Sequence, residues 1–310
     1  MTRVLFRLCL LLGWGALLLG LILQYGIQDR VPGLSVLFYA MPKPCLLGLA
    51  VTLLVWPWAP KSSRVIAAIT AIFLTLSWES SSWHRQVAES SDRMPHEEVR
   101  VLYWNLCRPT EKHQGMVDLV KEFQPHVAAF VEPGRGNLQA MCSTYESLLP
   151  GYSAAWMPRG ILWLSRVPTR YRDRGKLEEI GAYARFDVND LGPTFPVVVA
   201  DVYPHAFHSR EGQLLQALEK AQGRSDAILV GDFNTPLESA WLKDYRALYT
   251  NAFEVAGSGF KETWPLGLPL LSLDHCWFGA DWEVVEAKKL WRVTQSDHAA
   301  LLVTLRRKKG

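Results

Sequence analysis

The chain has 310 residues, of which 49% are hydrophobic, and a formal net charge of +3. That length suits one large domain or two modest ones. The small basic excess does not by itself favour a nucleic-acid-binding protein, whose surface is normally strongly basic. The five cysteines include no CxxC pair, so they offer no zinc-site spacing, and a disulfide between two of the three outside the apolar runs (Cys107, Cys142 and Cys276) stays open.

Apolar runs dominate the first eighty residues. The run at 4–27 is longer than the roughly 20 residues that a membrane span needs, and no A-x-A-like cleavage site follows it, so it predicts a span rather than a signal peptide. The runs at about 36–58 and 65–83 predict two further spans, with buried or interfacial helices as the alternative. Tryptophans near the ends of these runs are typical of membrane interfaces. We therefore expect a transmembrane region at 1–84.

Basic residues predict how these spans are oriented. Arg3 and Arg7 precede the first span, while Lys61 and Arg64 lie between the second and the third. Positive charge marks the cytoplasmic side of a membrane protein. Three spans then predict a multi-pass protein of the cell (inner) membrane with its C-terminal domain on the extracytoplasmic side. If only one of the last two runs spans, the domain lies inside.

A polar segment at 85–98 reads as a linker, and an α/β pattern begins after it. Apolar residues alternate or run together over short stretches that predict strands, and two stretches have helical spacing. We expect a domain at 99–310 with helices on the faces of packed sheets. The expected strands are 99–106, 126–132, 161–166, 182–188, 195–203, 227–233, 271–278 and 298–306, and the expected helices are 115–123 and 212–222.

Polar side chains stand at the ends of the expected strands, where α/β folds gather active-site groups. Each of them alone has an ordinary interpretation as a turn, a cap or a surface group. Asp274 is harder to explain in this way, because a carboxylate inside an apolar strand needs a partner. The informative feature is the order of the set along one chain: Asn105, Glu132, Tyr203, His205, Asp232, Asn234, Asp274, His275, Asp297 and His298.

That ordered set resembles the endonuclease/exonuclease/phosphatase family, the superfamily of deoxyribonuclease I. The resemblance covers about 99–306 and leaves out the apolar N-terminus. GDFN followed downstream by SDH is specific, and the acid-terminated strand upstream strengthens it. The matching elements are WN at 104–105, VE at 131–132, LSR at 164–166, GDFN at 231–234, LDH at 273–275 and SDH at 296–298.

The resemblance implies a four-layer α/β sandwich of two packed mixed β-sheets flanked by helices. It also implies hydrolysis of phosphate esters with a divalent metal, Mg²⁺ or Mn²⁺. Glu132 would be the main metal ligand, aided by Asn105 and Asp297. Asp232 would orient or deprotonate the attacking water, and Asn234 would hold a phosphate oxygen. His298 would bind the scissile phosphate, with Asp274 fixing its ring.

One departure concerns the position after the strand at 195–203. Many family members have a histidine there, whereas this sequence reads VVVADVYPHAFH. Aligned on Pro204, Tyr203 occupies the histidine position and His205 follows two residues later. Either Tyr203 or His205 is thus the expected phosphate contact or acid.

The substrate is a phosphate ester in nucleic acid or in a phospholipid head group, and the sequence does not decide between them. The segment RYRDRGK at 170–176 is a local basic patch that suits phosphates, although such runs are more often a solvated face. The alternative function is a membrane-tethered binding or scaffold protein that keeps the fold without turnover. No protein partner is inferred.

Overall fold

The computed structural model describes residues 2–85, 98–110, 113–134, 138–190, 192–205, 208–292 and 295–308. Nearly all of the expected linker, 86–97, lies outside the described residues. The chain forms two compact units. The first comprises Met1–Trp83 together with His205–Ser209 and Glu238–Trp241, and the second comprises His84–Pro204, Arg210–Leu237 and Leu242–Gly310.

The N-terminal part of the first unit is helical. It contains α1 (Thr2–Ile22) with a π-helical turn (Leu23–Ile27), α2 (Ser35–Ala40), α3 (Lys43–Leu54) and α4 (Lys61–Ser82). The run at 36–58, expected as one span, is two shorter helices that break at Pro42. Proline cannot donate the helical hydrogen bond and restricts the residue before it, so the helix ends there and restarts as α3.

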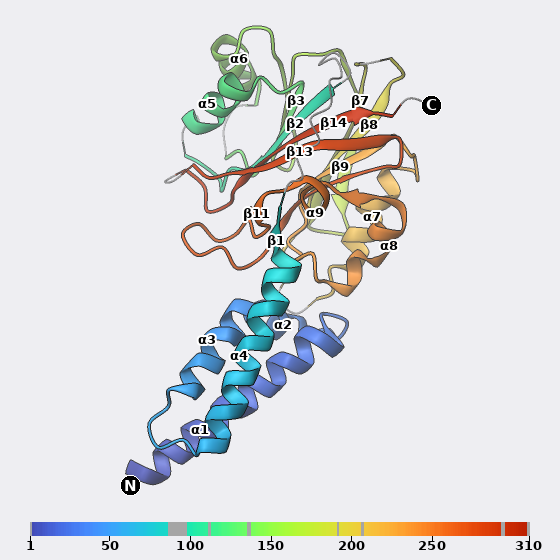
Figure 1. Ribbon diagram of the computed structural model, residues 1–310. Coiled ribbons are helices and arrows are strands. Elements are labelled where there is room, and N and C mark those ends of the chain that lie inside the picture. Colours follow the sequence, from blue (N-terminus) through green and yellow to red (C-terminus); the bar gives the residue numbers. More distant parts are fainter. Residues whose placement is uncertain are drawn as a thin grey trace. The chain divides into compact units, whose positions relative to one another are not determined.

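Contacts at both ends of the helices show their directions. Near one end, the Phe6 ring lies 4.5 Å from that of Trp58. At the other end, Tyr25 donates a hydrogen bond of 2.7 Å to Ser77. Helices α1 and α4 therefore run parallel, with α3 antiparallel to both (Figure 1). By length and composition, Val4–Ile27 and Lys61–Ser82 are able to cross a membrane, whereas α3, with 12 residues, is shorter than a usual span.

The second unit is built on two six-stranded mixed sheets. The order of the first is β13-β14-β2-β3-β5-β4, with β2 and β3 parallel, and the order of the second is β10-β12-β9-β8-β7-β6, with β8 and β9 parallel. The strands of the first sheet are β2 (Glu98–Asn105), β3 (Val127–Val131), β4 (Ser153–Met157), β5 (Ile161–Ser165), β13 (Trp282–Leu290) and β14 (Ala300–Arg307). Those of the second are β6 (Thr169–Leu177), β7 (Gly181–Val188), β8 (Phe195–Asp201), β9 (Ile228–Asp232), β10 (Thr250–Asn251) and β12 (Asp274–Phe278).

Helices cover the outer faces of the two sheets, which confirms the expected α/β sandwich (Figure 1). Helices α5 (Gln114–Phe123) and α6 (Leu138–Leu148) pack on the first sheet, while α7 (Glu211–Lys220) and α8 (Lys243–Leu248) lie by the second. A short helix, α9 (Ala252–Ala256), and the two-stranded pair β1 (Trp83–His84) and β11 (Gly259–Phe260) complete the set. Strands β4, β6 and β13 were not predicted from the sequence.

The alternation of side chains along the central strands positions the polar groups. Residues such as Tyr103 in β2, Val199 in β8 and Val230 in β9 belong to the apolar core between the two sheets. Successive side chains of a strand point to opposite faces. The next inward-facing positions are therefore Asn105, Asp201 and Asp232, all at the last residue of their strands. The alternation of side chains along the strands thus places these three polar side chains at one end of the space between the sheets.

Candidate active site

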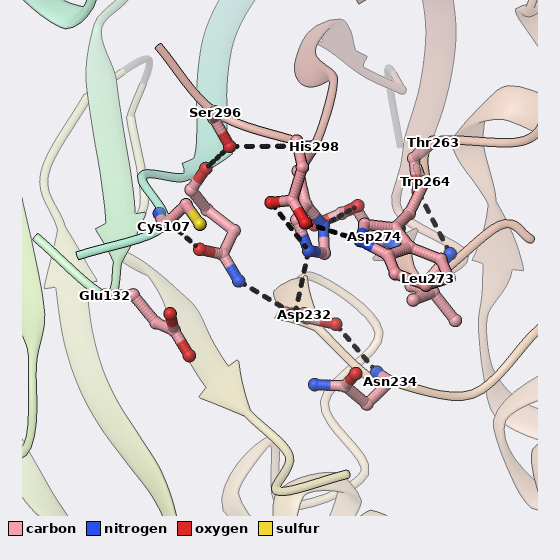
Figure 2. Close-up of polar contacts among 12 residues, drawn as sticks. Cys107, Glu132, Asp232, Asn234, Thr263, Trp264, Leu273, Asp274, Ser296 and His298 are labelled. Carbon is pink, nitrogen blue, oxygen red and sulfur yellow. Dashed lines mark hydrogen bonds and ion pairs between the residues drawn. The ribbon is translucent and has the colours of Figure 1, made fainter. Parts of the chain in front are cut away.

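The two sheets are joined at this end by a direct hydrogen bond. Asn105 Nδ2, from β2, donates to Asp232 Oδ2, from β9, at 2.9 Å. The other oxygen of Asp232 accepts from the backbone N–H of Asn234 at 2.8 Å. The carboxylate is 1% exposed, so both oxygens are held in fixed directions without much solvent. Figure 2 shows Asp232 next to Asn234 and to His298, the histidine of the SDH motif.

That histidine, His298, lies between two carboxylates. Its Nδ1 is 2.9 Å from Asp274 Oδ2, and its Nε2 is 4.0 Å from Asp232 Oδ2. All three side chains are buried. Asp274 begins β12 directly opposite Asp232 in β9, because the two strands pair in antiparallel register. The structure therefore brings together the acids of GDFN and LDH with the imidazole of SDH, as the sequence predicts.

Burial and charge shift the pKa values of both central groups. Burial, followed by the negative charge of Asp274, raises the pKa of Asp232 to about 7. Burial alone lowers the pKa of His298, but the charge and hydrogen bond of Asp274, with smaller contributions from Asp232 and Asp297, raise it to about 10. Near neutral pH, His298 is therefore a cation and Asp232 is a weak base close to its midpoint.

Neighbouring groups hold His298 in place. Trp104 Nε1 donates to the His298 carbonyl at 2.8 Å, and the backbone N–H of His298 donates to Ser296 Oγ at 3.0 Å. Ser296 in turn donates to the Asn105 carbonyl at 2.7 Å. The strand end that carries Asn105 and the loop that carries His298 are thus tied to each other. Such surrounding contacts keep a reactive group in one geometry.

Asp297 stands on the more open side of His298. Its Oδ2 accepts from Trp264 Nε1 at 2.8 Å, and its Oδ1 lies 3.9 Å from His298 Nε2. Partial burial raises the pKa of Asp297, but the Trp264 hydrogen bond and the charge of His298 outweigh that effect and lower it below its ordinary value. Asp297 is therefore an ionised and accessible carboxylate.

Glu132 follows β3 in an unusual backbone conformation. Its φ is +50°, in the left-handed region that non-glycine residues seldom adopt, and its N–H donates to the Gly160 carbonyl at 3.0 Å. Its Oε1 lies 2.7 Å from Arg108 Nη2. The pKa of the Cys107 thiol is raised by burial and then by Asp297 and Glu132, which puts both carboxylates near that thiol. Figure 2 shows Glu132 across from Asp232.

The donor set fits a divalent cation. Five carboxylates, Glu132, Asp201, Asp232, Asp274 and Asp297, act on the same small region, and His298 and Arg108 are cations that oppose them. A hard cation with oxygen ligands, such as Mg²⁺, would neutralise this excess. The predicted ligands Asn105, Glu132 and Asp297 offer those oxygens. A second group, Asp232, Asp274 and His298, has ligand atoms within 4.8 Å of one another, but the proton on His298 makes it a poor ligand set.

Asn234 has a left-handed backbone, with φ at +46°, which asparagine tolerates well. Its side-chain Nδ2 donates to the Val202 carbonyl at 2.8 Å, and its own carbonyl accepts from Arg210 Nη1. An amide nitrogen carries two N–H groups, so one of them remains for the predicted phosphate oxygen.

Tyr203 and His205, the two candidates for the role of the displaced histidine, have different surroundings. Tyr203 is 40% exposed, two residues after Asp201, and its backbone N–H donates to Gln213 Oε1 at 2.9 Å. His205 belongs to the first unit, where its Nδ1 is 2.8 Å from that of His208. The buried cluster of acids and His298 lies in the second unit. The roles of Tyr203 and His205 therefore stay predictions.

Sequence reasoning missed Asp201, Tyr103 and Arg108. Burial, then the charges of Asp232 and Glu132, raises the pKa of Asp201 well above its usual range. The Tyr103 hydroxyl is buried without a hydrogen-bond partner in the described residues, and after burial the nearby acids raise its pKa. Both lie on the inner face of strands already predicted. Counting side chains in steps of two back from Asn105 along its strand would have found Tyr103, and continuing the apolar alternation of 195–199 would have found Asp201.

All five cysteines are free thiols, so the disulfide left open by the sequence is not formed. Cys142 and Cys276 take no part in the cluster, and Cys107 contributes its backbone N–H to Asn105 Oδ1 at 2.9 Å. Its thiol pKa is raised rather than lowered, which disfavours a nucleophilic role.

Comparisons with known proteins agree with this geometry. A family model described as the Endonuclease/Exonuclease/phosphatase family matches residues 102–298. No curated protein matches the sequence. Similar solved structures include a family protein from Bacteroides thetaiotaomicron (15% identity, 69% of this chain and 99% of that chain, TM-score 0.53). The human Nocturnin catalytic domain with bound sulfate is similar too (17%, 70% and 100%, 0.53), as is truncated Caenorhabditis elegans TDP2 (16%, 67% and 98%, 0.54).

At these identities the solved structures show a shared fold, two mixed sheets with helices on their outer faces. The family match is stronger, because it extends from the first strand of the sandwich to the histidine of the SDH motif. It also covers well over half of the 310 residues. The chain therefore belongs to the endonuclease/exonuclease/phosphatase family.

Proposed function

We propose that the protein is a membrane-anchored phosphoesterase that depends on a divalent metal. The observation that supports it best is the position of His298, a buried imidazolium between Asp274 and Asp232 with its Nε2 toward the second acid. A fixed positive charge beside a fixed base suits phosphoryl transfer, which mainly needs positioning and charge neutralisation. The family to which the chain belongs supports the same reaction class.

Glu132, Asn105 and Asp297 would hold Mg²⁺ or Mn²⁺. When bound, the ion would supply a Lewis acid for a phosphate oxygen and for the leaving group. Asn105 connects the two parts of the site, since its Oδ1 accepts from Cys107 N while its Nδ2 orients Asp232. Its oxygen accepts one hydrogen bond and thus keeps a second lone pair for a metal ion.

The chain's own residues would handle the proton and the charge. Asp232 Oδ2 would accept a proton from the attacking water, for which a pKa of about 7 is well placed. Nε2 of His298 would donate a hydrogen bond to a phosphate oxygen and stabilise charge as it develops. Asp274 Oδ2 accepts from Nδ1 and so fixes which nitrogen faces the substrate. Asn234 would hold a second phosphate oxygen.

The first test is a substrate panel with the full-length protein in detergent. Single-stranded and double-stranded oligonucleotides, phosphoinositides and sphingomyelin would each be assayed with Mg²⁺ and with EDTA. We expect hydrolysis of at least one class in Mg²⁺ and its loss in EDTA. Tight binding to one class with no hydrolysis in any would favour the scaffold alternative.

For the membrane, we propose a multi-pass anchor with the C-terminal domain on the extracytoplasmic side. Two features support this. The end of α1 that holds Arg7 lies next to the loop before α4, because Phe6 contacts Trp58. Arg64 lies in the first turn of α4. In addition, leucines and isoleucines along α1 and α4 are exposed, as a lipid-facing surface requires.

Sidedness is tested by reporter fusions after Gly310 in a bacterial host. An alkaline phosphatase fusion is expected to be active, and a fluorescent protein that matures only in the cytoplasm is expected to be dark. The reverse pattern would place the domain inside, as an even number of crossings requires. Fusions after Pro60, between α3 and α4, are the internal control and are expected to give the opposite pair of signals.

A further inference from the structure

Strand β6 is a basic edge strand whose charges the proposed chemistry does not use. It lies at the end of the second sheet and pairs only with β7. Five successive residues, 170–174, are exposed, although a strand normally buries alternate side chains. We call residues 170–176 the basic strand; it carries Arg170, Arg172, Arg174 and Lys176 against one acid, Asp173.

A bulge places part of this charge on the face toward the site. Register shifts between Tyr171 and Asp173, so the residues after the bulge change sides. Tyr171 pairs with Phe186 and Arg174 with Ala184, and both partners face the core between the sheets. Lys176 pairs with Ala182 in the same way. The inner face of the second sheet therefore continues past the buried core onto β6, where it carries the exposed residues Tyr171, Arg174 and Lys176.

Side-chain and backbone contacts connect the basic strand to the candidate active site. Arg174 Nη1 lies 3.7 Å from Met157 Sδ, at the end of β4, and the turn after β4 brings the Gly160 carbonyl to the N–H of Glu132 at 3.0 Å. Through the second sheet, Lys176 aligns with Ala182, then Asp201, then Asp232. Three strand spacings separate Lys176 from Asp232, about 14 Å at the backbone.

Part of the charge of the basic strand is neutralised in its own fold, because Arg172 pairs with the buried carboxylate of Asp187. Asp173 accepts from Tyr183 at 2.7 Å, and Lys176 has an exposed partner, Glu179, at 3.1 Å, which is a weak pairing. Arg174 lies 5.8 Å from the centre of the Tyr171 ring. Edge strands often carry charges to prevent sheet-to-sheet aggregation. Positive or negative side chains can prevent such aggregation, and lysine is the common choice. This strand instead has three arginines, and arginine is the residue best suited to binding phosphate.

We propose that the basic strand binds the phosphate backbone of a single-stranded nucleic acid whose scissile phosphate lies at the candidate active site. The proposal rests on the proposed function and names its substrate class. A row of cations along an extended strand suits a linear polyanion, and the half-exposed Tyr171 ring offers a base a stacking surface. An anionic lipid surface is the alternative that the test below has to exclude.

The test compares the double variant Arg174→Ala/Lys176→Ala with a matched control, Lys121→Ala/Lys288→Ala, in the full-length protein. Both pairs are exposed, and Lys288, like Lys176, has one carboxylate partner, Glu286 for Lys288 and Glu179 for Lys176. Binding of a fluorescein-labelled oligothymidylate of about 12 nucleotides is measured by anisotropy in EDTA. Hydrolysis of bis(4-nitrophenyl) phosphate, too small to reach the basic strand, is measured in Mg²⁺.

We expect the double variant to raise the dissociation constant of the oligonucleotide about tenfold and to reduce the slope of log affinity against log salt by about 1.4. The control and the rate on the small diester should stay unchanged. Binding equal to the control would overturn the proposal, as would an equal loss on the small diester. It would also be overturned by an effect seen only on nanodiscs containing phosphatidylserine. If nothing is hydrolysed yet the binding difference remains, the proposed function fails, and only the binding of nucleic acid to the basic strand stands.

Discussion

Replacing Asp232 by Asn should lower the turnover rate by about 10³-fold or more without unfolding the protein. Asn keeps the shape of the side chain and still accepts from the backbone N–H of Asn234, as Asp232 does now at 2.8 Å. Its amide nitrogen replaces the oxygen that accepts from Asn105 Nδ2, so that hydrogen bond is lost. The Asn side chain cannot accept a proton from water. The rate is measured on whichever substrate the panel identifies, with Mg²⁺ present.

Thermal unfolding separates this loss from misfolding. The pKa of Asp232 is raised to about 7 in the fold, so the ionised carboxylate destabilises the metal-free protein at higher pH. A carboxyl with a raised pKa gives stability that is present at low pH and is lost as the pH rises through the folded value. Above about pH 7, removal of this buried charge offsets the lost hydrogen bond from Asn105, so the Asn variant in EDTA should melt close to the wild type.

A matched control is Asp226→Asn. Asp226 is also a buried carboxylate, but it pairs with Arg224 at 2.7 Å and takes no part in the site. This control should lose stability and keep its turnover rate, the opposite of Asp232→Asn. Full activity in the Asp232 variant would contradict the role of this carboxylate.

The second large effect is expected for Asp274→Asn. The Asp274 carboxylate is the main reason why the pKa of His298 is raised to about 10. Without that carboxylate, burial would lower this pKa. Asn still accepts a hydrogen bond from Nδ1, so the ring keeps its orientation and loses its charge. We expect a loss of about 10³-fold in turnover between pH 7 and pH 10, where wild-type His298 is a cation.

The pH profile distinguishes this cause from a structural one. In the wild type, the rate should rise as Asp232 loses its proton near pH 7 and fall as His298 loses its proton near pH 10. In Asp274→Asn the upper limb should move down by more than one pH unit, and the lower limb should also move to lower pH, because Asp274 helps to raise the pKa of Asp232. A uniform loss with both limbs unchanged would mean that Asp274 does not act through the charge of His298.

The sequence alone predicted most of the residues that the structure brings together. Asp232, Asp274 and His298 lie in three motifs separated by more than 60 residues in all, yet antiparallel pairing of β9 with β12 places the two acids opposite each other. Their order along the chain was informative because each motif stands next to a recognisable apolar strand. The hydrogen bond from Asn105 then joins the two sheets.

Other features depend on three-dimensional packing that a sequence pattern does not display. The segment 195–203 was predicted as one strand through Tyr203, whereas β8 ends at Asp201, which hid that acid inside an apparent strand. The basic strand was recognised only as a charged patch, because its polar residues lack the alternation of a strand. Its bulge is what brings Arg174 and Lys176 to the inner face.

The most direct test of the central claim is the rate of hydrolysis as a function of Mg²⁺, measured side by side for the wild type and for Asp232→Asn. The full-length protein in detergent is used with the best substrate of the panel. We expect the wild-type rate to rise with Mg²⁺ to saturation and to vanish in EDTA, while the variant stays near background at every concentration. Equal rates in Mg²⁺ and EDTA, or equal rates in the two proteins, would contradict a metal-dependent phosphoesterase centred on Asp232.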